Sequence, residues 1–147
     1  MTEKERNDFF YVCSLIEYTA RKTTNQRGVI AKALGESGLK KQLYDAEVNH
    51  CLSFEQISDE IIEQYHIPQG NFDTITGCKY TIPSFMDIGK LYSIIIEDCA
   101  KPGEEIKEMM DLFTSFICDE ISNFSTDLYY QNPSYLECSY KAGYLLE

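Results

Sequence analysis

Apolar residues recur every three or four positions through most of the chain, which is typical of helices packed around a core. The first such stretch is Asp8–Ala20. A second runs from Gln26 to Leu34 and is predicted to end at Gly35, and a third begins at Ser37 or Gly38. Ser53 then opens a fourth helix, because Ser53-Phe54-Glu55-Gln56 has the form of a capping box.

The C-terminal half continues this pattern after an interruption. Residues 67–83 carry the only strand-like composition, and we expect an extended loop there rather than a hairpin, because an isolated two-stranded hairpin is marginally stable. Ser84 caps a helix to about Ala100. The strongest apolar stripe follows and predicts one long helix of six turns, ended by Asn132-Pro133; it consists of Ile106, Met110, Phe113, Ile117, Ile121, Phe124 and Leu128.

These elements indicate an all-α protein, a bundle of about six helices with a short extended or hairpin-like segment near residues 67–83. A chain of 147 residues has the usual length of one domain. We therefore expect residues 1–147 to form a single helical domain, with 1–66 and 84–147 as candidate sub-lobes on either side of the loop.

Charge is unevenly distributed. The net charge is −11, and residues 53–147 hold 17 acidic residues against 5 Lys and Arg, whereas residues 1–52 hold 7 against 8. An acidic surface repels nucleic acid and anionic membranes and favours a basic partner. The N-terminus lacks the features of a signal peptide and no apolar run is long enough to span a membrane, so we expect a cytoplasmic protein.

No motif of catalysis or metal binding stands out. Two Glu-x-x-His motifs end at His50 and His66, as in di-iron bundles, but the helices that carry them should place the two motifs about 18–20 Å apart. His50 and Cys51 are adjacent, and neighbouring residues at a helix end are expected to point apart rather than form a catalytic pair. The six cysteines show no paired spacing. We expect no enzyme activity, no metal and no cofactor.

Residues 26–46 offer a DNA-binding alternative. Ala31 and Gly35 have the spacing that a helix-turn-helix favours. The candidate phosphate contacts are Arg27, Lys32, Lys40 and Lys41. The overall acidity of the chain weakens this alternative, because affinity for nucleic acid depends on phosphate neutralisation.

Tyrosines are concentrated near the C-terminus, where we expect either a partner interface or a tail packed on its own bundle. Tyrosine is enriched at interfaces because it combines a large rigid ring with a polar tip. The candidate interface residues are Tyr129, Tyr130, Tyr135, Tyr140 and Tyr144. Self-association through these side chains is a further option.

Residues 9–66 resemble a family of small bacterial helical domains of unknown function that are often encoded beside toxin-like ADP-ribosylating proteins. The resemblance rests on Leu15-Ile16-Glu17-Tyr18, Gly28-Val29, Leu34, Gly38-Leu39, Tyr44-Asp45, His50 and Ser58-Asp59-Glu60-Ile61-Ile62. It implies a non-enzymatic accessory or antitoxin-like role and no catalytic residues.

We therefore expect a non-enzymatic cytoplasmic protein that binds a basic protein partner. The alternatives are a small helix-turn-helix DNA-binding regulator and an acidic inhibitor from a mobile element that mimics nucleic acid.

Overall fold

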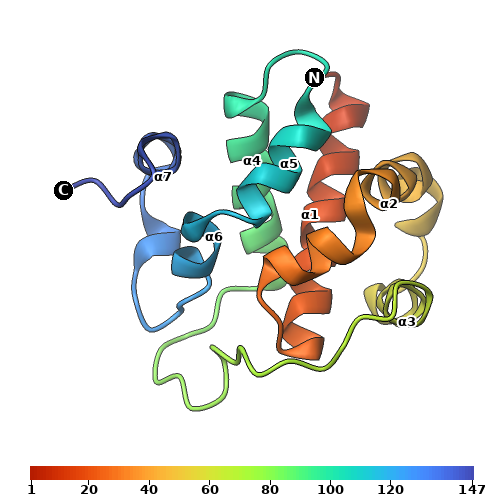
Figure 1. Cartoon of the computed structure of the whole chain (residues 1–147), viewed down its shortest axis with the longest axis horizontal. Helices are drawn as coiled ribbons and strands as arrows, with labels where there is room; N and C mark the ends of the chain where they lie inside the picture. The colour runs from red at the N-terminus through yellow and green to blue at the C-terminus, as the bar shows by residue number, and fades with distance from the viewer.

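The computed structural model describes residues 1–147 and is all-α, as predicted: seven α-helices, one 3₁₀ helix and no strand. Figure 1 shows α7 on the opposite side of the bundle from α2 and α3. The elements are α1 (Glu3–Thr23), α2 (Arg27–Asn49), α3 (Phe54–Gln64), α4 (Phe85–Cys99), α5 (Glu105–Phe113), α6 (Phe116–Ile121), the 3₁₀ helix η1 (Leu128–Tyr130) and α7 (Pro133–Ala142).

The first helix is the centre of the bundle. Every residue from Tyr11 to Glu17 is buried, and a helix buried on all sides over two turns must be surrounded by other elements. Its most extensive contact is with α4, followed by α2 and α3 (Figure 1). The α1–α4 approach depends on Gly89, because a Cβ atom there would collide with the backbone and side chain of Ser14.

The second helix contains a sharp kink where the sequence predicts a break. Gly35 has φ 68° and ψ 176°, a conformation that glycine adopts without steric cost. The hydrogen-bonded helix nevertheless continues on both sides of Gly35, from Arg27 to Asn49. The predicted pair of helices is therefore present as two arms of α2.

The predicted long helix at 106–128 is wrong. The chain leaves the helical conformation at Thr114 and Ser115, and the stripe is divided among α5, α6 and η1. The Thr114 hydroxyl donates to the Met110 carbonyl and the Ser115 hydroxyl to the Leu112 carbonyl, so these side chains compete with the helix for its own acceptors. Pro133 begins α7 instead of ending a helix, with Asn132 as its cap.

Most of the stripe is still buried despite these breaks. Phe113, Ile117, Ile121, Phe124 and Leu128 are each no more than 9% exposed, whereas Ile106 and Met110 are only partly buried. The five buried residues belong to one continuous core of 29 buried hydrophobic residues contributed by elements from both halves of the chain. Five of the seven predicted core positions are therefore confirmed, while Met109 and Leu112, which the predicted stripe does not include, are fully buried.

Residues 67–83 form the expected extended loop, which is attached to the end of α1. The Gly70 and Phe72 amides donate to the carbonyls of Thr23 and Thr24, both at 2.8 Å. The buried Asn25 carboxamide donates to the Pro68 carbonyl at 2.7 Å. These bonds hold the first part of the loop against the α1–α2 connection and leave its tip free to face α6.

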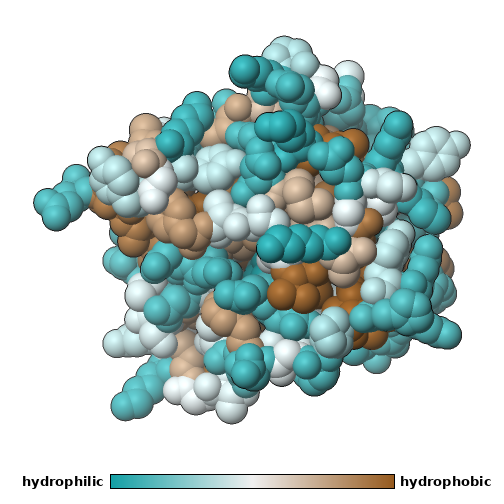
Figure 2. All heavy atoms as spheres, viewed as in Figure 1, coloured by the Kyte–Doolittle hydropathy of each residue, from teal (hydrophilic) through white to brown (hydrophobic).

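None of the helices is both long enough and apolar enough to cross a membrane. Figure 2 shows a largely hydrophilic face on which apolar side chains form small separate patches, one of them around α7. All six cysteines are free; Cys13 and Cys118 are buried, whereas Cys51 and Cys138 are exposed.

Candidate functional site

Two neighbouring cavities lie between the tip of the 67–83 loop and the chain that follows α6. The first, here called the tyrosine groove, has a volume of about 570 Å³. The second, here called the acidic cavity, has a volume of about 450 Å³. Ser125 lines both of them, so the two cavities are adjacent.

The tyrosine groove is built on a buried phenylalanine. Phe124 is 1% exposed, and the Tyr129 ring meets it edge-on at a centroid distance of 6.0 Å. Tyr130 lies against Tyr129 at 4.5 Å, and the Tyr129 hydroxyl donates to the Thr81 carbonyl at 3.5 Å. Tyr80 lines the groove from the loop side. Tyr80 and Tyr130 are 67% and 78% exposed, so two aromatic rings are presented to solvent on a fixed base.

The base of the groove is connected to the interior by Arg21. The Arg21 guanidinium lies over the Phe124 ring, 4.9 Å from the centroid. Its Nε atom also donates to Glu17 at 2.7 Å, and Glu17 is fully buried. A cation over an aromatic face is a favourable arrangement. The groove is therefore supported by side chains of α1 and not only by its own loop.

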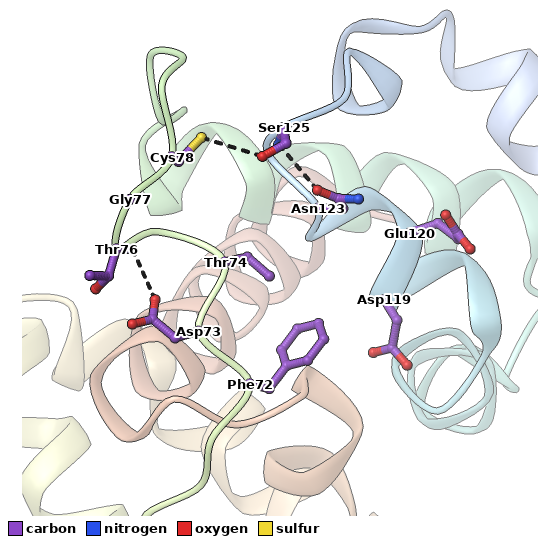
Figure 3. A pocket seen from close by; sticks show the side chains of 10 residues that line it. All are labelled: Phe72, Asp73, Thr74, Thr76, Gly77, Cys78, Asp119, Glu120, Asn123 and Ser125. Atoms are coloured by element: carbon purple, nitrogen blue, oxygen red, sulfur yellow. Dashed lines mark hydrogen bonds between the residues drawn. The ribbon is translucent and has the colours of Figure 1, made fainter.

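The acidic cavity has carboxylates on two walls. Figure 3 shows Asp73 on the loop, Asp119 and Glu120 on α6, and the ring of Phe72 between Asp73 and Asp119. No Lys or Arg lines this cavity. No group of three or more His, Cys, Asp or Glu side chains is placed to hold a metal ion.

The two aspartates differ in environment. Asp73 Oδ1 accepts hydrogen bonds from the Ile75 and Thr76 amides, both at 3.0 Å, and hydrogen bonds from Thr76 and Ile75 lower the pKa of Asp73. Asp119 is half-buried and accepts a hydrogen bond from Gln26 at 3.1 Å; its burial raises its pKa. Asp73 therefore shapes the loop, while Asp119 presents a carboxylate to the cavity.

The five candidate interface tyrosines do not form one surface. Tyr129 and Tyr130 line the groove. Tyr135 and Tyr140 are half-buried on α7, where the Tyr135 hydroxyl donates to the Leu146 carbonyl at 2.6 Å. Tyr144 is 63% exposed beyond α7. The C-terminal segment thus combines packing on the bundle, through the fully buried Leu136, with an exposed aromatic surface.

The groove residue that sequence reasoning missed is Tyr80. It lies about 50 positions before the tyrosine cluster, between loop residues with strand-like composition. Whether Tyr80 is exposed depends on how the folded chain holds this loop, which the local sequence does not show. The cluster alone pointed to Tyr129 and Tyr130 but not to the side chain that completes the groove.

The four candidate DNA contacts differ in how buried they are. Lys32, Lys40 and Lys41 are exposed, and Lys41 is paired with Asp45 at 2.7 Å. Arg27 is only 1% exposed and its guanidinium binds the Glu17 carboxylate, with Nε donating at 2.8 Å. The proposed role of Arg27 as a phosphate contact is therefore wrong, because a charge buried against Glu17 cannot reach a ligand at the surface.

The expected separation of His50 and Cys51 is also not found. The His50 Nδ1 and Cys51 Sγ atoms lie 3.9 Å apart. Both residues follow the last residue of α2, so the 100° spacing of a regular helix does not apply to them. Both side chains are exposed.

Comparison of the chain with protein families, with characterised proteins and with solved structures finds no match.

Proposed function

We propose that this chain is a non-enzymatic cytoplasmic protein that binds a basic protein partner through the tyrosine groove and the adjacent acidic cavity. The observation that carries the proposal is the pairing of two exposed rings, Tyr80 and Tyr130, with a cavity lined by carboxylates and no basic side chain. Aromatic rings supply contact area, and carboxylates select for Lys or Arg on the partner.

The charge of the chain supports this choice. The segment from 53 to 147 carries 17 acidic residues against 5 basic ones, and both cavities lie within that segment. Such a field steers a basic partner toward the surface and repels acidic ones. An accessory or antitoxin-like role, in which the acidic protein covers a basic surface of another protein, agrees with this distribution.

The DNA-binding alternative has less support. With Arg27 buried, residues 26–46 offer only three exposed lysines, one of them paired with Asp45. A protein that neutralises fewer phosphates binds nucleic acid more weakly and with a smaller dependence on salt. We therefore favour a protein partner.

The proposal is tested by affinity capture from the organism that encodes the chain, with matched tyrosine variants. The double variant Tyr80→Ser/Tyr130→Ser removes the exposed rings of the groove. The control Tyr44→Ser/Tyr144→Ser removes two rings of similar exposure, 85% and 63%, outside it. We expect a partner that is retained by the wild type and the control, and that binds the groove variant roughly 30-fold more weakly, as for the loss of aromatic anchors.

The role of charge is tested on the same partner. Raising the salt to about 1 M, where screening is nearly complete, should weaken binding of the partner to the wild type. At low salt, Asp119→Asn should bind the partner more weakly than the wild type does. A partner that binds the groove variant as well as the control, or whose binding does not change with salt, would contradict the proposal.

A further inference from the structure

A separate cavity of about 410 Å³ lies where α1 meets the end of α2 and the beginnings of α3 and α4. It shares no residue with the tyrosine groove or the acidic cavity, so a ligand bound there would be independent of the proposed function. Its volume is within the range of small-molecule sites. It is here called the His50 cavity, after the residue that directly follows α2.

The inner wall of the His50 cavity is aromatic. The rings of Tyr11 and Phe54 are stacked at a centroid distance of 5.3 Å with 25° between their planes. Phe10, Met86 and Ala46 complete the apolar lining. The Phe10 ring already has a cation over it, since the Lys90 ammonium lies 5.3 Å from its centroid. A flat apolar body fits such a wall, because stacked or edge-on aromatic contacts are favourable.

The mouth of the cavity is polar. It is formed by Asn7, Asp8 and His50. Asp8 accepts one hydrogen bond, from Lys4 to its Oδ2 atom at 2.8 Å, and its side chain is 14% exposed. The hydrogen bond from Lys4 to Asp8 raises the pKa of Lys4.

The charge around the mouth is negative. An adjoining cavity of about 430 Å³ shares Asn7, Asp8 and His50 and adds Glu3, Lys4 and Glu47. Three carboxylates therefore face one ammonium. Lys4 lies 2.8 Å from Asp8 and 3.8 Å from Glu47, so it neutralises only part of this charge. The remaining negative charge attracts a cationic group and repels a carboxylate.

Tyr11 brings an unpartnered hydroxyl to this cavity. Its side chain lines the cavity and is more than nine-tenths buried, and its hydroxyl has no hydrogen-bond partner. A buried hydroxyl without a partner is costly. Burial and the nearby charge of Glu60 raise the pKa of Tyr11 to about 12, so the hydroxyl stays neutral, and a neutral hydroxyl can accept a hydrogen bond from an ammonium group.

We propose that the His50 cavity binds a small aromatic amine, with the ring against Tyr11 and Phe54 and the protonated nitrogen at the Asp8 carboxylate. The stacked wall selects the ring, and the acidic mouth selects the charge. The site uses three helices and the end of a fourth, so it exists only in the folded chain.

The test uses 2-phenylethylamine as the probe and the full chain labelled with ¹⁵N. Titration should produce saturable shifts of the backbone amides of Asp8, Tyr11 and His50. The matched acid, 3-phenylpropionate, carries a similar ring and the opposite charge, and it should bind at least about tenfold more weakly. This comparison needs no variant, so it does not depend on whether a substitution folds.

Variants then test the carboxylate. Asp8→Asn should weaken binding of 2-phenylethylamine about tenfold, as for the loss of a charge-assisted hydrogen bond. Asp45→Asn is the matched control, because Asp45 forms the same kind of pair with Lys41, at 2.7 Å, and does not line the cavity. The amide spectrum of each variant reports its fold.

Three results would each overturn the proposal. The first is the lack of saturable shifts at the cavity amides up to about 10 mM 2-phenylethylamine, a weak-binding limit for so small a molecule. The second is equal binding of the acid. The third is equal binding by the Asp8→Asn and Asp45→Asn variants when both are folded.

Discussion

The buried ion pair between Glu17 and Arg27 makes a sharp prediction about stability. Glu17 is 0% exposed and Arg27 1% exposed, and the two are joined by two hydrogen bonds. Arg21 adds a third bond to the same carboxylate at 2.7 Å. Burial opposes the charge of Glu17, yet the bonds and charges of the two arginines lower its pKa below the ordinary value. Glu17 is thus held as a carboxylate inside the bundle.

The perturbation is Arg27→Met, which keeps a long side chain but removes the charge. Glu17 would then be a buried carboxylate with Arg21 as its one remaining partner. Removing one member of a buried pair costs about 3–5 kcal/mol. That is a large part of the roughly 5–15 kcal/mol by which domains are stable. We expect the variant to fold but to be much less resistant to denaturant.

The assay is urea unfolding followed by circular dichroism. With an m value of about 2 kcal/mol per molar, a loss of about 4 kcal/mol lowers the midpoint by about 2 M. The double variant Glu17→Leu/Arg27→Met removes both charges, and replacement of a whole buried pair by apolar side chains is often neutral or stabilising. We therefore expect it to recover only part of the lost stability, because Glu17→Leu also leaves Arg21, whose Nε atom donates to Glu17, without that partner.

Two results would refute this reasoning. One is a midpoint for Arg27→Met within about 0.3 M of the wild type, which would mean that the pair is solvated in solution. The other is a double variant no more stable than Arg27→Met, which would mean that the unpaired Glu17 carboxylate is not the source of the lost stability.

Two further predictions concern α7. Burial and the neighbouring Asp98 raise the pKa of Glu137 to about 7, so the folded state holds this proton more tightly than the unfolded chain, and stability should fall as the pH rises from about 5 to about 8. Because solvent screens this partly buried group, we expect the pH-dependent loss of stability to be about 1 kcal/mol. Glu137→Gln should abolish this pH dependence; thermal melts with the same pH dependence for variant and wild type would contradict the prediction. Deleting residues 131–147 removes the fully buried Leu136 and should lower the melting temperature by about 10 °C, whereas an unchanged melt would show that α7 only rests on the surface.

The sequence predicted the helical class and most helix positions because these depend on local periodicity and capping. Ser53 and Ser84 begin helices as expected, each accepting a hydrogen bond from the amide three residues later. The start of α1 was missed by five residues, although its signal is local: Thr2 and Glu5 form a reciprocal capping box. The break at Thr114–Ser115 was missed because apolar spacing continues through it.

The site was less accessible to sequence reasoning. Tyr129 and Tyr130 were identified from their clustering, but the loop that supplies Tyr80 is placed by bonds to the end of α1, at a separation of more than 40 residues. Arg27 looked like a surface cation because its partner, Glu17, lies on another helix. Long-range pairing of this kind depends on how helices pack, and it produces no repeating pattern in the amino-acid sequence.

The pairing of α1 with α4 also determines how the chain can be divided. The exposed stretch Lys79–Thr81 separates the sequence into two pieces, each of which carries one of these two helices. Neither piece can cover its own apolar surface, because the most extensive helix contact of the protein joins one piece to the other. The two polypeptides, produced separately, should therefore be less ordered alone and regain structure on mixing, which would let them serve as the two fragments of a complementation reporter.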